Sequence, residues 1–275
     1  MPTRAGVIGA PIAHSLSPAI FRAAFEAAGL DWIYDAYEVT EADAAAFLDR
    51  MRVGEIEGLS VTMPDKAAVI PALDHLSPGA RDLGAVNCVA RTDGELWGHN
   101  TDGDGLVDAL RLESGVELGG LRCVVVGAGG AGRAVARAFG AAGAASVAVV
   151  NRSAERAVAA AALAGAAGVV GHADDIAGAD LVVNATSLGM GDDARLPFDA
   201  SLVHSGQVVV DIVYHPLVTP LLAAAEVAGA QTVGGLGMLV HQAAHAFRLW
   251  TGEEPPVDAM RAGAERALAE REGIA

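Results

Sequence analysis

Beyond about residue 121 the chain carries continuous apolar runs, separated by alanine-rich stretches of helical composition. Apolar residues follow one another in these runs without alternating with polar ones, which indicates strands covered on both faces. Such strands form parallel sheets in which a covering helix follows each strand. We therefore predict an α/β fold for this part of the chain, with strands at Cys123 to Val126, Val147 to Val150, Leu181 to Val183 and Val208 to Val213.

A glycine-rich loop follows the first of these runs and precedes an alanine-rich helix. It fits the pattern GxGxxG, which is a dinucleotide-binding signature when a strand lies before it and a helix after it. Gly127 would make the tight turn, Gly129 would let backbone N–H groups approach a pyrophosphate, and Gly132 would allow close helix packing. The alternative is a glycine-rich loop without a ligand. The motif indicates a Rossmann-type domain, and it reads Gly127-Ala128-Gly129-Gly130-Ala131-Gly132.

The choice of dinucleotide depends on the residues that follow the next predicted strand. A domain specific for NAD places an acidic residue about 20 positions beyond the glycines, where it binds the ribose 2′-hydroxyl. This chain has arginine in that segment, and a guanidinium pairs with the 2′-phosphate that distinguishes NADP. The alternative for Arg156 is a solvated charge on the next helix. We predict NADP as the cofactor, held through Asn151, Arg152, Ser153 and Arg156.

The first hundred residues alternate between strand-like and helix-like stretches. Asp93-Gly94 predicts a hairpin, because this pair accepts the positive φ of a type I′ turn. Two helix starts are expected, one with Ser17 as the cap and Pro18 in the first position, and one at Thr40 with a helix to about Met51. The predicted strands are Ala5 to Ile8, Trp32 to Val39, Leu59 to Thr62, Cys88 to Arg91 and Glu95 to Trp97.

The end of the chain is helical again, over Met238 to Trp250 and Val257 to Glu270. Domain boundaries near Asp102 and near Gly235 to Gly237 imply that the chain leaves its first domain, builds the second and returns. We predict a two-domain α/β protein. Its N-terminal α/β substrate-binding domain (1–102) is completed by C-terminal helices (238–275), and its Rossmann-type parallel-sheet domain (103–237) binds NADP.

Composition excludes several classes of partner. The formal net charge of −16 argues against sequence-independent nucleic-acid binding and against anionic membrane surfaces, since both need surplus Lys and Arg. No apolar run reaches the roughly 18 residues of a membrane span, and the first residues make a poor signal peptide. Cys88 and Cys123 are too few for a disulfide framework and are expected to be buried, reduced thiols. We expect a cytoplasmic protein that binds a small molecule.

Arginine supplies 17 of the 18 basic residues, and Lys66 is the exception. A lysine whose pKa is lowered gives and takes protons, whereas arginine stays protonated above about pH 12. A chain that otherwise uses arginine would keep lysine where proton transfer matters. The alternative is chance, since the remaining lysine has to stand somewhere and most lysines are solvated surface charges.

Asp102 stands at the start of a predicted helix that runs to about Leu112. Aspartate is a common N-cap, so a purely structural role is one interpretation. The other is a carboxylate that also faces the cleft between the domains. There it would form an acid–base pair with Lys66 beside the nicotinamide.

Two patterns imitate metal sites, and we reject both. Asn100 to Arg111 resembles a calcium loop, but its twelfth position is Arg111, where a bidentate glutamate is required. His241 and His245 are spaced like a zinc pair, yet Gln242 stands where a metalloprotease motif has glutamate, and no third ligand is evident. We expect no metal.

Eight short segments contain most of the polar and glycine-rich motifs: His14-Ser15-Leu16-Ser17-Pro18, Val61-Thr62-Met63-Pro64-Asp65-Lys66, Gly84-Ala85-Val86-Asn87, Gly98-His99-Asn100-Thr101-Asp102-Gly103, Gly127 to Ala131, Asn151-Arg152-Ser153, Asn184-Ala185-Thr186-Ser187-Leu188-Gly189-Met190, and Gly235-Leu236-Gly237-Met238-Leu239-Val240-His241-Gln242. In this order they resemble the shikimate dehydrogenase family. The resemblance covers essentially the whole chain, and the joint order is far more specific than any single segment.

The resemblance implies NADP-dependent interconversion of 3-dehydroshikimate and shikimate, in chorismate and aromatic amino-acid biosynthesis. Lys66 would exchange the proton at the carbonyl or hydroxyl oxygen, and Asp102 would pair with it and hold the substrate's hydroxyls. By the same analogy Ser15 and Ser17 would bind the substrate carboxylate. The other implied contacts are Thr62, Asn87, Tyr214 and Gln242 around the substrate, with Ile212 and Gly235 on the nicotinamide side.

Two positions depart from the family's usual pattern: Ser60, where Asn is usual, and Asp65, where a non-acidic residue is usual. An Asp65 carboxylate that points inward would raise the pKa of Lys66, whereas one that points to solvent would have no effect. These departures leave the finer substrate choice open, so a quinate or quinate/shikimate dehydrogenase using NAD(P) is an alternative. A further alternative is a non-catalytic regulator that senses NADP; loss of the Lys66 and Asp102 pair would be its expected mark, and both residues are present. The oligomeric state is also open, with a homodimer as one option.

Overall fold

The computed structural model describes residues 1–64 and 66–272, so Asp65 and its predicted effect on Lys66 lie outside the described residues. The chain forms two compact units. The first consists of Met1–Thr101 together with the residues from Val240 onward, and the second consists of Asp102–Leu239. The chain thus leaves the first unit, builds the second and returns to the first.

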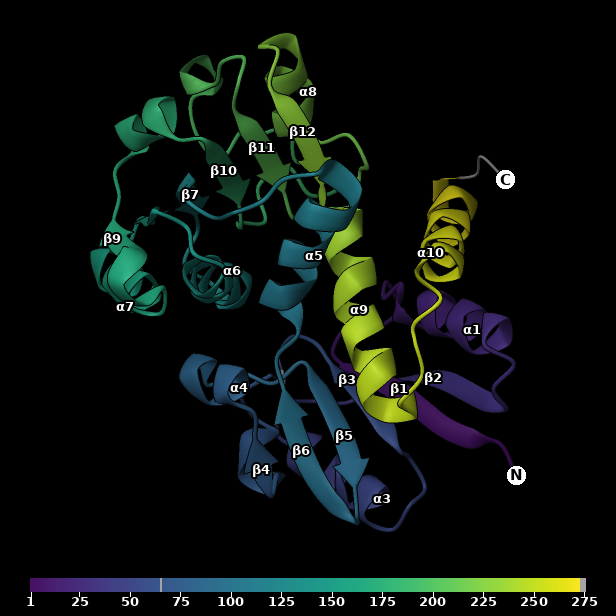
Figure 1. The fold of residues 1–275 in the computed structure, drawn as a ribbon. Coiled ribbons are helices and arrows are strands. Elements are labelled where there is room, and N and C mark those ends of the chain that lie inside the picture. The colour runs from purple at the N-terminus through teal and green to yellow at the C-terminus, as the bar shows by residue number, and fades with distance from the viewer. Residues whose placement is uncertain (65, 273–275) are drawn as a thin grey trace. The chain divides into compact units, whose positions relative to one another are not determined.

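The sheet of the first unit contains β1 (Thr3–Gly9), β2 (Trp32–Glu38), β3 (Gly58–Val61), β4 (His75–Leu76), β5 (Cys88–Thr92) and β6 (Glu95–His99). Its strand order is β2-β1-β3-β5-β6-β4 (Figure 1). β1 pairs in parallel with β2 and β3, whereas β5 pairs antiparallel with β3 and β6. Asp93 and Gly94 have φ angles of 53° and 87°, which confirms the predicted hairpin turn.

The helices of the first unit are α1 (Ser17–Ala27), α2 (Ala44–Phe47), α3 (Asp49–Arg52), α4 (Pro78–Leu83), α10 (Val257–Glu272), the larger part of α9 (Gly235–Thr251) and the 3-10 turn η1 (Ile70–Ala72). Two predicted helix starts are wrong. Leu16, not Ser17, is the N-cap of α1, because the helix already begins at Ser17, whose N–H donates to Oγ of Ser15. The Thr40 hydroxyl donates to the Asp43 carboxylate at 2.7 Å, and two one-turn helices follow in place of a long one.

Aromatic side chains hold α1 and α9 against the sheet of the first unit. Phe21 of α1 stacks on Tyr34 of β2 with ring centroids 4.5 Å apart, and the ring of Trp250 lies 4.7 Å from that of Phe21. Nε1 of Trp250 donates to the backbone oxygen of Val89 at 3.0 Å. Gly58 leaves room for the indole, since a Cβ there would collide with it. A helix from the end of the chain therefore completes a core that the N-terminal residues begin.

The sheet of the second unit contains β7 (Arg122–Val126), β8 (Ser146–Val150), β9 (Gly168–Val170), β10 (Leu181–Asn184), β11 (Val208–Asp211) and β12 (Gln231–Gly234). Neighbouring strands pair in parallel, in the order β12-β11-β10-β7-β8-β9. Counted along the chain, this is the 3-2-1-4-5-6 order of dinucleotide-binding Rossmann domains. The predicted parallel sheet is confirmed. β9 and β12 were missed because these edge strands are largely exposed and lack a continuous apolar run.

The helices of the second unit are α5 (Asp102–Ser114), α6 (Gly130–Ala141), α7 (Ala154–Ala162) and α8 (Pro220–Val227), with the 3-10 turns η2 (Gly165–Ala167), η3 (Ala173–Gly178) and η4 (Ala200–Leu202). α7 packs beside β8 and β9 (Figure 1). Gly103 lets α5 approach α6, because a Cβ there would collide with the backbone oxygen of Ala134. Small residues on these helices thus allow close packing around the β-branched core of the central strands.

Both cysteines are free and buried, as predicted. Burial raises the pKa of the Cys88 and Cys123 thiols to about 12, so both stay protonated at neutral pH. Among residues 1–64 and 66–272, no helix combines the length and apolar character needed to cross a membrane.

Candidate functional site

In the first unit, candidate residues gather where β1 and β3 end. The two strands are parallel neighbours, so their carboxyl ends meet at one edge of the sheet. A loop with Ser15 follows β1, and Thr62 follows β3 directly. The Thr62 N–H donates to the backbone oxygen of Ile8 at 3.0 Å, and the Ala10 N–H donates to that of Met63 at 3.2 Å. The structure thereby brings the Ser15 loop and Thr62 to the same edge.

The loop after β1 turns back on itself before α1 begins. The Ser15 N–H donates to the backbone oxygen of Ile12 at 3.0 Å, and Oγ of Ser15 accepts from the Ser17 N–H at 3.2 Å. Ser17 is only 9% exposed. The two predicted carboxylate ligands are therefore adjacent, and local hydrogen bonds hold both of them in this loop.

A hydrogen-bonded cluster links the segments before β5 and after β6 to α9. Nδ2 of Asn87 donates to Oγ1 of Thr101 at 3.0 Å and to Oε1 of Gln242 at 3.3 Å. Oδ1 of Asn87 accepts from the Thr101 N–H at 2.8 Å, and the Thr101 hydroxyl donates to the backbone oxygen of Gln242 at 3.0 Å. The structure brings Asn87 and Gln242 together across 155 residues of sequence. The structure adds Thr101 to this cluster, although Thr101 was not predicted as a site residue. Its position next to Asp102 in a polar run of the sequence could have identified it.

Lys66 belongs to the same edge of the first unit. Its backbone oxygen accepts from the Val86 N–H at 2.7 Å, and the Val61 N–H donates to the backbone oxygen of Asn87 at 2.8 Å. These bonds hold the lysine's backbone beside the segment that carries Asn87. Lys66 as a whole residue is half-buried.

The loop after β7 in the second unit has the shape that a pyrophosphate needs. Gly127 has a φ of 110°, which favours glycine, and a Cβ there would lie 2.8 Å from the backbone oxygen of Ala185. A Cβ on Gly132 would collide with the backbone of Gly127, so α6 approaches the strand closely. A Cβ on Gly129 or Gly130 would meet no atom within 4 Å. A phosphate therefore has room to reach the N-terminus of α6, and the residues present fit a dinucleotide.

The segment after β8 lies beside this glycine loop. Oδ1 of Asn151 accepts from the Ala128 N–H at 3.2 Å, and Nδ2 of Asn151 donates to the backbone oxygen of Ser153 at 3.0 Å. Ser153 caps α7, where its Oγ accepts from the Arg156 N–H at 3.4 Å. The side chains of Arg152 and Arg156 are exposed at the start of α7. This arrangement can present a guanidinium to a 2′-phosphate.

A buried polar network lies at the carboxyl ends of β10 and β11. Asn184, Asp211 and Thr219 are each 0% exposed. The Asp211 carboxylate accepts from Nδ2 of Asn184 at 2.9 Å, from the Thr219 hydroxyl at 2.7 Å and from the Val213 N–H at 3.0 Å. Burial raises the pKa of Asp211, and these hydrogen bonds oppose that rise. Asp211 was not among the predicted site residues, although a carboxylate directly after the run Val208 to Val210 is a recognisable sequence signal.

The residues predicted for the nicotinamide side adjoin this network. The Thr186 N–H and hydroxyl donate to Oδ1 of Asn184 at 3.0 and 2.7 Å. The Ile212 N–H donates to the backbone oxygen of Asn184 at 3.1 Å. A Cβ on Gly235 would collide with the backbone of Ile212, so these two residues are adjacent. Tyr214 follows in the same loop and is half-buried.

Asp102 is the first residue of α5 and is 8% exposed. Close packing of Gly103 against α6 holds this end of the helix. Asp102 belongs to the second unit and Lys66 to the first. Their pairing therefore stays a prediction.

The two metal-like sequence patterns have other roles. Most of the calcium-like segment lies in helix α5 and not in a loop, and Nδ2 of Asn100 donates to the backbone oxygen of Ala85 at 3.1 Å. His241 is buried in α9, with 4% of its surface exposed. Within the described part of the chain, no group of three His, Cys, Asp or Glu is placed to hold a metal ion.

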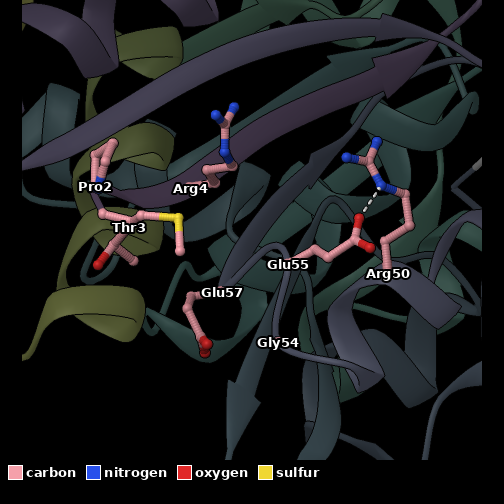
Figure 2. Close-up of a pocket in the computed structure, with 8 residues that line it drawn as sticks. Pro2, Thr3, Arg4, Arg50, Gly54, Glu55 and Glu57 are labelled. Carbon is pink, nitrogen blue, oxygen red and sulfur yellow. Dashed lines mark hydrogen bonds and ion pairs between the residues drawn. The ribbon is translucent and has the colours of Figure 1, made fainter.

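A pocket of about 590 Å³ lies at the opposite end of the first unit's sheet (Figure 2). Its lining includes Thr3 and Arg4 at the start of β1, and Glu55 and Glu57 just before β3. Nε of Arg50 donates to Glu55 at 2.9 Å across one side of it. Because the candidate residues follow the carboxyl ends of β1 and β3, this pocket is separate from them.

Three family models match the chain. The model described as "Shikimate dehydrogenase substrate binding domain" matches residues 7–89. "Shikimate / quinate 5-dehydrogenase" matches residues 110–189, and "Shikimate 5'-dehydrogenase C-terminal domain" matches residues 235–262. The matched residues include parts of both units.

Individual relatives match over nearly the full length. The chain is 45% identical over 277 residues to the shikimate dehydrogenase (NADP(+)) of Geobacter sp. (strain M21), covering 97% of this chain and 94% of the relative. It is similar to the solved shikimate 5-dehydrogenase of Thermus thermophilus in complex with NADP(H) and shikimate, at 41% identity and a TM-score of 0.90, over 96% and 99% of the two chains. It is also similar to the quinate dehydrogenase of Corynebacterium glutamicum in complex with NAD, at 37% identity and a TM-score of 0.88, over 96% and 99%.

Proposed function

The chain belongs to the shikimate dehydrogenase family, and from this premise we propose that it catalyses the reversible, NADPH-dependent reduction of 3-dehydroshikimate to shikimate. This oxidoreductase reaction is a step in the biosynthesis of chorismate and the aromatic amino acids. Two supports come from different parts of the chain. The first unit carries clustered hydroxyl and amide side chains, with the backbone of Lys66 bound to the neighbouring segment, and the second carries a glycine loop with room for a pyrophosphate.

The second unit binds NADP in this proposal. Gly127 to Ala131 and the N-terminus of α6 hold the pyrophosphate, with Asn151 fixing the loop through its bond to the Ala128 N–H. Arg152, Ser153 and Arg156 bind the 2′-phosphate. Ile212 and Gly235 form the nicotinamide side. When bound, NADPH supplies the hydride that reduces the substrate carbonyl.

Lys66 supplies the proton. Its ammonium donates to the carbonyl oxygen as the carbon accepts the hydride, and in the reverse direction the neutral amine takes the proton from the hydroxyl. Asp102 pairs with Lys66 and binds substrate hydroxyls. Arginine could not replace Lys66, because a guanidinium does not release its proton near neutral pH.

The first unit orients the substrate in this proposal. Ser15 and Ser17 donate hydroxyl hydrogen bonds to the carboxylate, so an anion is held without a buried arginine. Thr62, Asn87 and Gln242 hold hydroxyl groups, joined by Tyr214 from the second unit. Residues 1–102 with 238–275 thus act as the substrate domain and 103–237 as the NADP domain.

The observation that supports the proposal most is the cluster of Asn87, Thr101 and Gln242 on the edge that also carries Lys66. The test is to mix the purified protein with shikimate and NADP⁺ and to follow NADPH absorbance. We expect NADPH to form at a rate proportional to enzyme. NADP⁺ binding without turnover would contradict the proposal and favour a non-catalytic NADP-sensing regulator.

A quinate dehydrogenase using NAD is the second candidate, because the chain is 37% identical to such an enzyme over nearly its full length. Arg152 and Arg156 favour NADP over NAD. Rates with shikimate and quinate, each with NADP⁺ and NAD⁺, separate the two candidates. We further propose a cytoplasmic location, a homodimer, and small-molecule ligands without nucleic-acid or membrane partners; gel filtration with light scattering tests the dimer.

A further inference from the structure

The segment between β1 and α1 carries Ser15 but contains no helix or strand over residues 10–16. A carboxylate ligand binds more tightly if this segment is ordered beforehand, because ordering it on binding costs conformational entropy. The Ser15 N–H bond to Ile12 and the Ser17 N–H bond to Ser15 hold it from within. A further contact comes from the other end of the sequence.

Arg271, in the last turn of α10, reaches this segment. Its Nη1 donates to the backbone oxygen of His14 at 3.0 Å, and its Nη2 donates to the backbone oxygen of Ser15 at 3.1 Å. The planar guanidinium suits two acceptors at once, and hydrogen bonds from a charged donor are stronger than those from a neutral one. One side chain thus orients two consecutive peptide groups, the second of them belonging to Ser15.

The helix that carries Arg271 is firmly seated in the first unit. α10 crosses α1 at Gly263, where a Cβ would lie 2.7 Å from the backbone oxygen of Ala19 and 2.8 Å from Cβ of Ala23. Met260, Ala264 and Leu268 on the same face of α10 are at most 2% exposed. Arg271 therefore projects from a helix that packs on α1. Residues 10–16, called the serine segment below, lead directly into α1.

We propose that Arg271 is a positioning residue for the substrate carboxylate: by holding the backbone oxygens of His14 and Ser15, it sets the Ser15 hydroxyl before the ligand arrives. This inference rests on the proposed function. Arg271 also places a charge that does not titrate beside the serine segment, in a chain whose net charge is −16. That local charge weakens the repulsion an anionic substrate meets.

The test compares Arg271→Ala with Arg266→Ala, which removes an exposed arginine from the same helix. In Arg271→Ala we expect the KM for shikimate to rise about fivefold, which corresponds to about 1 kcal/mol. The kcat and the KM for NADP⁺ stay close to wild type, since neither depends on the serine segment. Arg271→Lys recovers only part of the loss, because an ammonium lacks the planar fork that holds both oxygens. Arg266→Ala behaves as wild type.

An unchanged KM for shikimate in Arg271→Ala, or an equal rise in Arg266→Ala, overturns the inference. A parallel rise in the KM for NADP⁺ with a lower denaturation midpoint also overturns it, because it indicates general loss of structure. Wild-type turnover of shikimate is measured first. Its absence contradicts the proposed function itself, whereas an active wild type with an unaffected Arg271→Ala contradicts only the role of Arg271.

Discussion

The Tyr34 hydroxyl donates a 2.8 Å hydrogen bond to Oγ of Ser60, at a position where Tyr34 has no exposed surface. Its ring stacks on Phe21 of α1, with ring centroids 4.5 Å apart. Ser60 lies on β3, and Thr62 follows the end of that strand. A buried phenol thus connects β2, β3 and α1 beneath the proposed carboxylate site. Ser60 thus has a defined partner in this chain.

Tyr34→Phe removes only the hydroxyl and leaves the stacking on Phe21. We expect the free energy of unfolding to fall by about 1 kcal/mol, because Ser60 loses a buried hydrogen-bond partner. Urea denaturation measures this. Tyr37→Phe is the control, since its hydroxyl lies 3.5 Å from Asp35, at the limit of a hydrogen bond. An equal loss in both variants would contradict the role of the Tyr34 hydroxyl.

Stability falls on the alkaline side because of the two buried thiols. Burial raises the pKa of Cys88 and Cys123 from 9.0 to about 12, so the folded chain keeps protons that the unfolded chain loses in this range. Their contribution is complete below about pH 9 and declines as the pH rises toward 12, by up to about 1.4 kcal/mol per pH unit and thiol. Urea denaturation at a series of pH values shows the slope. In Cys88→Ala the slope becomes shallower; an unchanged slope would count against this explanation.

Thr219→Val tests the buried network of the second unit. The substitution removes the 2.7 Å donor to Asp211 and the 3.2 Å cap of the Leu222 N–H at the start of α8. We expect a loss of about 2 to 3 kcal/mol in the free energy of unfolding at neutral pH. This loss in the free energy of unfolding becomes smaller at acid pH. Once Asp211 is protonated, its carboxyl group is neutral and no longer needs a hydrogen-bond donor on each oxygen. Thr232→Val on exposed β12 is the control, and an equal loss there would refute the prediction.

Lys66→Ala and Lys66→Arg test proton transfer. Both should lower kcat with shikimate by about 100- to 10 000-fold, since neither side chain exchanges a proton near neutral pH. NADP⁺ affinity, measured by calorimetry, stays near wild type because the glycine loop belongs to the other unit. An active Lys66→Arg enzyme would show that positive charge suffices and that Lys66 is not the proton donor.

Arg152→Ala tests the assignment of NADP. Losing a charge-assisted contact to the 2′-phosphate should raise the KM for NADP⁺ by about 10- to 100-fold. The KM for NAD⁺, which lacks this phosphate, stays nearly constant. The same kinetics on Arg156→Ala show which of the two exposed guanidiniums makes the contact. If neither substitution changes the preference for NADP⁺ over NAD⁺, specificity does not come from this segment.

Short-range patterns predicted much of the fold for a physical reason. A run of apolar residues such as Cys123 to Val126 can be buried only with both faces covered, and Asp93-Gly94 adopts a positive φ at little cost. Predictions failed at two helix starts and at the edges of the second unit's sheet. Ser17 is not the helix cap, because the helix already begins at Ser17 and its N–H is bound by Oγ of Ser15. The exposed edge strands β9 and β12 carry no continuous apolar run, so no local signal marked them.

The amino-acid order determined that the second unit is a Rossmann domain and which residue types carry the chemistry, because burial and backbone conformation act on neighbouring residues. Only the tertiary structure decided which groups meet. Asn87 contacts Gln242 across 155 residues, and Arg271 contacts Ser15 across 256. A hydrogen bond acts over about 3 Å, so such pairs exist only once helices and sheets have packed. Their partners stand too far apart along the chain for any local pattern to join them.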